Sequence, residues 1–317
     1  MEKLKIKESF EKFLFKHKED KLVISSHRKV DIDGLACAFS LSKLFPNSIL
    51  AFNELDEGAK GLAEKLDIES VALDSLDKTQ YSGLIVVDTA SYVLLEQARK
   101  WRILLVIDHH HSEGRNMETE LMIVDENSPS AAQIVADLLD EIESDVAYAL
   151  AAAIISDTAR FKAGSADTFE TLGKLMKIAD AKYPDLLSVA EPELRSDVKM
   201  AVLKAFQRVN FIYASGYVIA TSEVGSNESD AAQLISDVAD VAFVASWKDK
   251  EKETRISARA RKGFPVALNE VMKEVGETFS GGGGGHPKAA GASLKVHTQE
   301  ALKECVDVVT LKLSNLA

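Results

Sequence analysis

The stretch WRILLVIDHHH, residues 101–111, joins a run of branched apolar side chains to an aspartate and three histidines. A short apolar run of this kind is typical of a strand buried on both faces of a sheet. Segments with helical spacing separate several such runs, and strands alternating with helices indicate a parallel sheet covered by helices. The other apolar runs are residues 21–27, 47–52, 82–88 and 120–126, and the helical segments are 34–45, 91–100, 130–142 and 145–158.

The pattern changes near residue 215. Three strand-like runs and two helical stretches follow, which predicts a smaller mixed α/β domain. The strands are expected at 216–224, 238–249 and 253–263, and the helices at 228–238 and 265–275. We therefore predict an α/β chain with an N-terminal parallel-sheet domain at 1–183, a helical linker at 184–214 and a C-terminal domain at 215–317.

Composition limits the class of protein. The chain has 317 residues and a net charge of −12, and a protein that coats long nucleic acids is expected to be basic instead. Its two cysteines, Cys37 and Cys305, both lie in apolar segments, which favours a reducing compartment over a disulfide framework. The charged N-terminal segment lacks the apolar centre of a signal peptide, and no segment is apolar over the length of a membrane span. We expect a soluble, cytoplasmic protein.

Carboxylates and imidazoles follow the apolar runs of the first domain. In an open α/β sheet the carboxyl ends of parallel strands line one crevice, so these side chains should meet there. Like charges held together repel unless a cation lies between them, and oxygen and imidazole ligands suit manganese or a related divalent ion. Taken alone, Asp88 before Thr89 would be a helix cap and a single histidine would be scaffolding. The candidate set is His27, Asp31, Asp33, Asp88, Asp108, His109, His110, His111 and Asp157.

At these positions the sequence resembles a known family. HRKVDID, VVDTA, VIDHH and ISDTARF are similar to the four motifs of the DHH phosphoesterases, which include RecJ-like exonucleases and NrnA-type oligoribonucleases. SGGGGGHPKAAGAS, residues 280–293, is similar to the glycine-rich motif of the C-terminal domain associated with that family. The first motif departs from the NrnA pattern at Val30, Ile32 and Cys37, and the pair Asp33–Gly34 is closer to the RecJ type.

The resemblance implies six metal ligands and two divalent ions, manganese first, with magnesium or cobalt as alternatives. Asp88 would bridge the two ions, and His27 and Asp31 would complete the site of one. The other ion would be bound by three further ligands, which are Asp33, His109 and Asp157. Two such ions can activate water and neutralise charge that develops on phosphorus.

The resemblance also divides the roles of the neighbouring residues. His110 would contact the scissile phosphate, and Asp108 would support the histidines from behind. His111 lies outside the motif and is expected to be a surface residue or a loop anchor.

The glycine run Gly281–Gly285 is expected to form an anion-binding loop, because glycine weakens regular strands and helices and allows backbone amides to approach an anion. The AAG that follows is expected to allow close helix packing. A flexible linker is the alternative for glycines alone. Arg259 would contact a substrate phosphate or base, or else lie on a solvated edge strand. The predicted substrate-binding residues are Arg259, Gly283, Gly284, Gly285 and His286.

Together these features predict a two-metal phosphodiesterase that releases 5′-mononucleotides from short RNA or DNA oligonucleotides held between the domains. The alternatives are a phosphatase of a small compound such as 3′-phosphoadenosine 5′-phosphate and a RecJ-like single-strand exonuclease. A non-catalytic replication partner ranks below them, because such proteins tend to lose metal ligands. No membrane partner is expected, and homodimer formation is left open.

Overall fold

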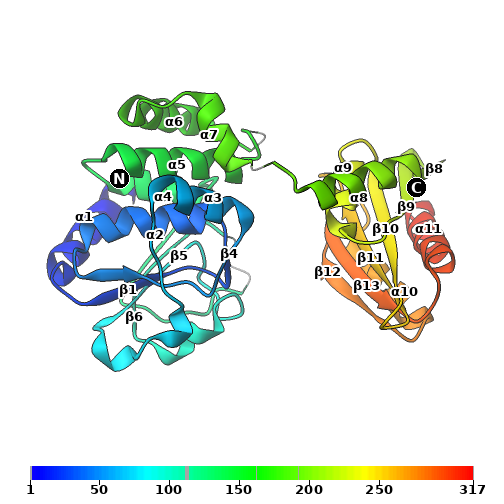
Figure 1. Ribbon diagram of the computed structural model, residues 1–317, viewed down its shortest axis with the longest axis horizontal. Coiled ribbons are helices and arrows are strands. Elements are labelled where there is room, and N and C mark those ends of the chain that lie inside the picture. Colours follow the sequence, from blue (N-terminus) through cyan, green and yellow to red (C-terminus); the bar gives the residue numbers. More distant parts are fainter. Residues whose placement is uncertain (1, 111–113, 162, 192, 317) are drawn as a thin grey trace. The chain divides into compact units, whose positions relative to one another are not determined.

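The computed structural model describes residues 2–110, 114–161, 163–191 and 193–316 (Figure 1). The chain folds into two compact units, Met1–Glu193 and Leu194–Ala317, each with its own sheet and core. Of the predicted site residues, His111 lies outside the described part of the chain. No helix of the described residues is long and apolar enough to cross a membrane.

The first unit contains a five-stranded parallel sheet, as the apolar runs predict. The strand order is β3-β1-β5-β6-β7. After β1 the chain forms β3 along one edge of β1, and it then crosses over to form β5, β6 and β7 beyond the other edge. β1, β5 and β6 are buried along their whole length, because side chains cover both faces. The bounds are β1 Leu22–Ser25, β3 Ser48–Leu50, β5 Gly83–Val87, β6 Ile103–Asp108 and β7 Leu121–Val124, with a separate parallel pair, β2 Lys29–Val30 and β4 Glu54–Leu55.

Helices cover one face of this sheet. Side chains of α2, α4 and α5 pack on Leu22, Ile24 and Ile85 in the larger core of the unit. The bounds of the helices are α1 Glu2–His17, α2 Ile32–Leu44, α3 Glu57–Leu66, α4 Ala131–Leu138, α5 Ser144–Asp157, α6 Ala166–Ala179 and α7 Tyr183–Ala190.

The opposite face is covered by loops and short 3₁₀ helices, which are η1 Leu73–Ser75, η2 Lys78–Gln80 and η3 Glu96–Lys100. The helix predicted at 91–100 is therefore wrong over its first half. Tertiary contacts fix the backbone there instead, and one of them takes a carbonyl that a helix would use. The amide of Tyr92 donates to Asn116 Oδ1 at 2.8 Å, and the carbonyl of Leu94 accepts from the Arg28 amide at 2.7 Å.

The second unit contains a six-stranded mixed sheet in the order β12-β13-β11-β10-β9-β8. Only the pair β9–β10 is parallel among its described strand pairs. Helices α8 and α9 pack on one face, and α10 and α11 on the other. The bounds are β8 Asn210–Ala214, β9 Tyr217–Glu223, β10 Val241–Lys248, β11 Glu253–Ala260, β12 Gly282–His286, β13 Ala289–Leu294, α8 Ser196–Gln207, α9 Glu228–Ser236, α10 Leu268–Thr278 and α11 Thr298–Ser314.

The segment between the predicted domains is mostly helical, as expected, but its last five residues form β8. β8 pairs with β9 in an antiparallel register, with Phe211 opposite Ala220. Aromatic and β-branched side chains favour this extended conformation. Within the same segment, Val202 and Ala205 of α8 already pack in the core of the second unit.

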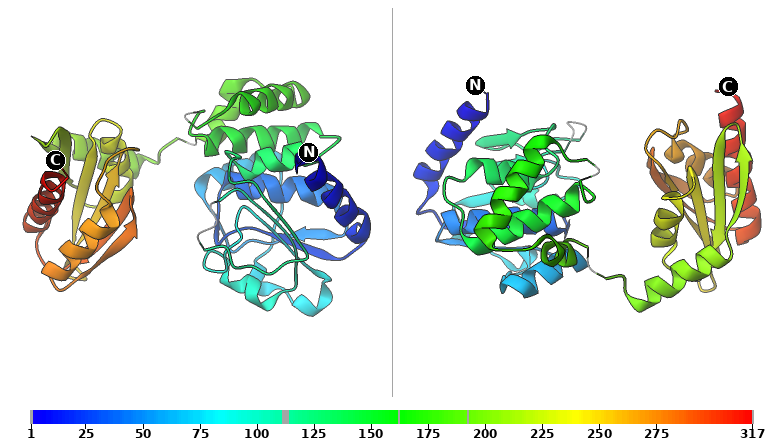
Figure 2. Two further views of the ribbon diagram at one scale, coloured as in Figure 1. Left: turned by 180° about the vertical axis from the view of Figure 1, so that it is seen from behind. Right: turned by 90° about the horizontal axis from the view of Figure 1, so that it is seen from above.

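The glycine run was expected to be a loop, and this prediction is wrong. Gly282–His286 forms the edge strand β12. The AAG after it lies in strand β13, where Ala290 packs with side chains of α10, so the expected close packing against a helix is confirmed. The glycines are needed because β12 lies directly against α10 (Figure 2). A Cβ at Gly283 would stand 1.8 Å from the carbonyl oxygen of Met272. Glycine inside a strand often marks such a close backbone approach.

This packing predicts opposite effects for two neighbouring glycines. Gly283→Ala should lower the free energy of unfolding by about 3 kcal/mol, at the upper end of overpacking costs, because the clash is with backbone. Gly284→Ala is the matched control, since nothing lies within 4 Å of its added Cβ. It should be neutral or stabilising by roughly 0.5 kcal/mol. Urea denaturation of both variants measures the difference, and equal stabilities would contradict the proposed contact with α10.

Candidate metal centre

The predicted metal ligands come from four segments of the first unit. His27 follows β1, Asp88 follows β5, and His109 follows β6, all at the carboxyl ends of parallel strands. The sheet order reverses between β1 and β5, and ligands of open α/β sheets bind at such a point. Asp157 reaches the same place from the last position of α5.

Asp88 lies at the centre of the group. Its Oδ2 is 3.2 Å from His27 Nε2, and its Oδ1 is 3.5 Å from His109 Nε2. The side chain is 2% exposed, and Oδ1 has no hydrogen-bond partner among the described residues. The backbone is left-handed, with φ of 58°, which costs free energy in a residue other than glycine. No α-helix starts at Thr89, so Asp88 is not a helix cap.

Beside one oxygen of Asp88 lies a first group of ligands. Atoms of His27, Asp31 and Asp88 lie within 4.8 Å of one another, the span of a cation site. Asp31 is the N-cap of α2, where Oδ1 accepts from the Gly34 amide and Oδ2 faces His27 at 3.7 Å. Burial would lower the pKa of His27, but the hydrogen bonds and charges of Asp31 and Asp88 raise it to about 10. A metal bound here would therefore have to displace a proton from this imidazole.

A second group lies beside the other oxygen. Atoms of Asp33, His109 and Asp157 also lie within 4.8 Å of one another. His109 Nε2 is 3.2 Å from Asp157 Oδ2 and 4.0 Å from Asp33 Oδ2. On the far side of the ring, His109 Nδ1 donates to the Ser128 carbonyl at 3.3 Å, which leaves Nε2 as the nitrogen available to a metal.

Asp33 is held by the start of α4. Its two carboxylate oxygens accept from the amides of Ala131 and Ala132 at 2.7 and 2.8 Å. Burial, together with the nearby charges of Asp157 and Asp88, nevertheless raises the pKa of Asp33 well above its usual range. Burial likewise raises the pKa of Asp157. Such crowding of buried carboxylates favours a bound cation, which would keep them ionised.

His110 differs from His109 in its contacts. Its Nδ1 is hydrogen-bonded to Asp108 Oδ1 at 2.8 Å, and the side chain is 54% exposed. The same Asp108 oxygen accepts from the amides of His109 and His110, so one carboxylate orders both histidines. Hydrogen bonding to Asp108 raises the pKa of His110. His110 Nδ1 is also 3.7 Å from Asp88 Oδ1, but Asp108 occupies that nitrogen.

Two contacts that support the histidines could not be predicted from the sequence. The first is the Ser128 carbonyl, a backbone group that no residue type reveals. The second is Arg115, whose Nη2 donates to the His110 carbonyl at 3.4 Å and to Glu126 Oε1 at 2.8 Å. Arg115 follows the histidines by a few residues, and only its placement in space shows that it ties them to the segment after β7.

The predicted substrate-binding residues of the second unit divide between two sides of its sheet. Arg259 and His286 are both in register with Ala289, and Gly284 lies two residues before His286, so these three share one face. A shallow cavity of about 420 Å³ on this part of the sheet is lined by Arg255, Ser293 and several glycines. Gly283 packs against α10 instead, and Gly285 takes a φ of 135°, which suits glycine alone. The Arg259 guanidinium donates to Ser229 Oγ at 2.6 Å.

Two protein families match consecutive parts of the chain. The DHH family N-terminal domain matches residues 21–156, and the DHHA1 domain matches residues 214–315. The uncharacterized protein MJ0988 of Methanocaldococcus jannaschii is 32% identical over 316 residues, which is 92% of each chain. The bifunctional oligoribonuclease and PAP phosphatase NrnA of Bacillus subtilis is 26% identical over 92% of this chain and 95% of its own.

Solved structures agree on the fold. An exopolyphosphatase-related protein from Bacteroides fragilis superimposes with a TM-score of 0.78 at 15% identity, covering 99% of this chain and 97% of the other. Together with the two matched domains and the clustered motifs, these similarities identify the chain as a member of the DHH family of phosphoesterases, with a DHHA1 domain in its C-terminal half.

Proposed function

We propose that this phosphoesterase is a two-metal phosphodiesterase that hydrolyses short RNA or DNA oligonucleotides to 5′-mononucleotides. The observation that carries the proposal is the position of Asp88, whose two oxygens face two separate groups of ligands. One carboxylate between two cation sites is the arrangement needed to hold a pair of ions close together. The NrnA relatives support the choice of substrate, since their name describes an oligoribonuclease.

The side chains fit divalent cations. The buried Oδ1 of Asp88 accepts no hydrogen bond from the described residues, so a cation would satisfy it. The available ligand atoms are carboxylate oxygens and imidazole nitrogens, without a thiolate. This donor set suits manganese, with magnesium or cobalt as alternatives. When bound, the ions would supply Lewis acidity to the phosphate and activate water. The proposed ligands are His27, Asp31 and Asp88 for one ion, and Asp88, Asp33, His109 and Asp157 for the other.

The remaining residues of the centre act on the substrate. His110 keeps its Nε2 directed away from Asp108 on a half-exposed side chain, and in the proposed role this atom donates to the scissile phosphate. Asp108 fixes the ring through Nδ1. We assign no ligand role to His110, because its inner nitrogen is already hydrogen-bonded.

In the second unit, Arg259, Gly284 and His286 are proposed to bind the part of the substrate that is not cleaved. Arg259 supplies a positive charge on this face of the sheet, and the glycines of β12 leave room beside it for a flat group such as a base. The net charge of −12 favours short substrates, because long strands require an extended basic track. Substrates of about two to five nucleotides would use both contacts at once.

The test is His286→Ala with two substrates. We expect cleavage of a dinucleotide to fall about tenfold or more, because a charged or polar contact to the uncleaved part is lost. Hydrolysis of bis-p-nitrophenyl phosphate should stay nearly unchanged, since that ester needs only the metal centre. His297→Ala, an exposed histidine of the same unit, is the control and should affect neither substrate. An equal loss on both substrates would assign His286 to the fold.

A second candidate is supported by the name of the NrnA relatives, which also describes a phosphatase of PAP. Release of phosphate from 3′-phosphoadenosine 5′-phosphate with no mononucleotide release from dinucleotides would establish it and reject the oligonucleotide proposal. Processive degradation of long single strands would instead favour the RecJ-like alternative. A series of labelled oligonucleotides with product analysis separates the three activities.

A further inference from the structure

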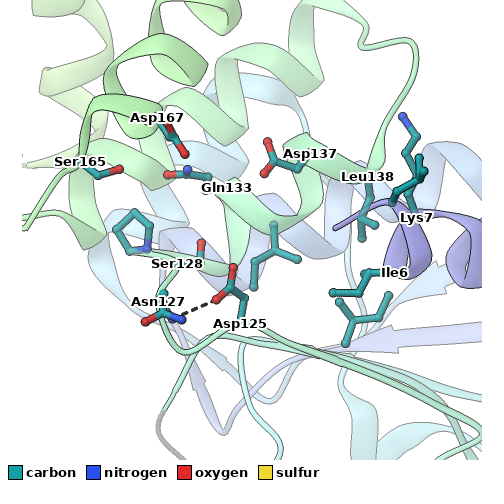
Figure 3. Close-up of a pocket in the computed structure, with 14 residues that line it drawn as sticks. Ile6, Lys7, Asp125, Asn127, Ser128, Gln133, Asp137, Leu138, Ser165 and Asp167 are labelled. Atoms are coloured by element: carbon teal, nitrogen blue, oxygen red, sulfur yellow. Dashed lines mark hydrogen bonds between the residues drawn. The ribbon is translucent and has the colours of Figure 1, made fainter. Parts of the chain in front are cut away.

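A cavity of about 510 Å³ lies in the first unit, outside the candidate metal centre (Figure 3). Three elements distant in sequence form its walls: α1, the segment from β7 into α4, and the start of α6. A volume of this size is in the range of small-molecule sites. Its lining residues include Ile6, Asp125, Ser128, Gln133, Ile134 and Asp167.

The polar part of the lining includes several groups that can only accept hydrogen bonds. Three carboxylates line the cavity, those of Asp125, Asp137 and Asp167. Gln133 is 5% exposed, and its Oε1 is buried without a hydrogen-bond partner among the described residues. A buried amide oxygen in this state destabilises the fold unless a donor reaches it. A ligand that presents N–H groups would therefore fit the side of the cavity shown at the left of Figure 3.

The remaining part of the lining is aliphatic. Ile6, Ile134 and Leu138 contribute apolar surface, and Lys7 is the one cation among the lining residues. The amino group of Lys7 forms an ion pair with Asp140 at 2.5 Å, so its charge is directed to a carboxylate that is not part of the lining. The lining is thus acidic at one side and apolar at the other.

We propose that this cavity binds a small organic cation with several N–H donors and an aliphatic stem, the chemistry of a polyamine. The ammonium groups would be placed at Asp125 and Asp167, an N–H would satisfy Gln133 after a small rotation of its amide, and the stem would cover Ile134 and Leu138. A cation is favoured over a neutral donor because the carboxylates of Asp125 and Asp167 line the site.

The site is coupled to the metal centre through Ser128. This residue lines the cavity, and its carbonyl accepts the hydrogen bond from His109 Nδ1 that orients the proposed metal-binding nitrogen. An occupant that orders the Asp125–Pro129 segment orders this carbonyl as well. Binding at the two places is then reciprocal, so that each ligand changes the affinity for the other by the same factor.

Calorimetric titration of the full chain with spermidine, in about 0.15 M NaCl and saturating manganese, tests the site. We expect one saturable binding event that Gln133→Leu and Asp167→Asn each weaken about tenfold. Glu170→Gln on the same helix is the matched control, because it removes an equal charge outside the cavity and should have no effect. The absence of saturable binding, or an equal loss in Glu170→Gln, would overturn the site.

The coupling has its own measurement. Manganese titrations with and without saturating spermidine should differ in affinity by about fivefold in the wild type. Gln133→Leu should remove the difference, which excludes competition of spermidine for the metal ligands. Identical manganese affinities in the wild type would overturn the coupling and leave the binding site standing.

Discussion

Replacing Asp88 with alanine is expected to abolish hydrolysis, with a loss of roughly a thousandfold or more, since two sites would lose their shared ligand. The fold should survive. The carboxylate is buried among other carboxylates, so its removal relieves repulsion in the metal-free protein and offsets the loss of its ion pairs with His27 and His109. Asp88→Asn is the second variant, because asparagine tolerates the left-handed backbone better than alanine does.

A matched control separates the backbone cost from the loss of the ligand. Asp67 is exposed, lies at the end of α3 and has a φ of 54°, close to the 58° of Asp88. Asp67→Ala should therefore show the backbone cost of the substitution without a loss of activity. Activity, manganese content and thermal stability are measured on all three variants. Full activity of Asp88→Ala in manganese would contradict the two-metal proposal.

The second large effect separates two adjacent histidines. His109→Ala should lower manganese affinity by at least about a hundredfold, because its Nε2 points to Asp157 and Asp88. His110→Ala should keep the metal and lose about 10²- to 10³-fold in kcat, because its proposed partner is the phosphate. The inner nitrogen of His110 is already occupied by Asp108, which is the structural reason for assigning it no ligand role.

Metal content and turnover are measured side by side on these variants. His111→Ala serves as the control, since the family motif ends at His110, and its effect should be mild. Loss of metal from His110→Ala with retention in His109→Ala would reverse the two assignments. Loss of metal from both would mean that His110 is a ligand in place of a phosphate contact.

Sequence alone predicts a large part of the first unit. The apolar runs that end at His27, Asp88 and Asp108 encode buried parallel strands, because few other structures bury continuous branched side chains in such short segments. Parallel strands bring their carboxyl ends to one edge, so the meeting of the acid and imidazole groups follows from topology. Local pattern was sufficient here because the strand and its ligand are adjacent in the chain.

Local pattern failed where a partner distant in sequence decides the conformation. The glycine run forms a strand because it pairs with β13, and it must be glycine because the backbone of α10 leaves no room for a side chain at Gly283. Glycine has no conformational preference that would predict this pairing. In the segment 91–100 the Leu94 carbonyl accepts from the Arg28 amide in place of a helical hydrogen bond, and the Tyr92 amide is held by Asn116.

The chemistry of the site divides in the same way. Sequence by itself determined which carboxylates and imidazoles are available and that they meet at one edge of a sheet. Only the tertiary structure decided that Asp88 turns its two oxygens to different groups, that a Ser128 carbonyl orients His109, and that the α4 amides hold Asp33. Almost every residue carries the same backbone N–H and C=O groups, so the contacts of these groups are set by packing and cannot be predicted from the order of the residue types.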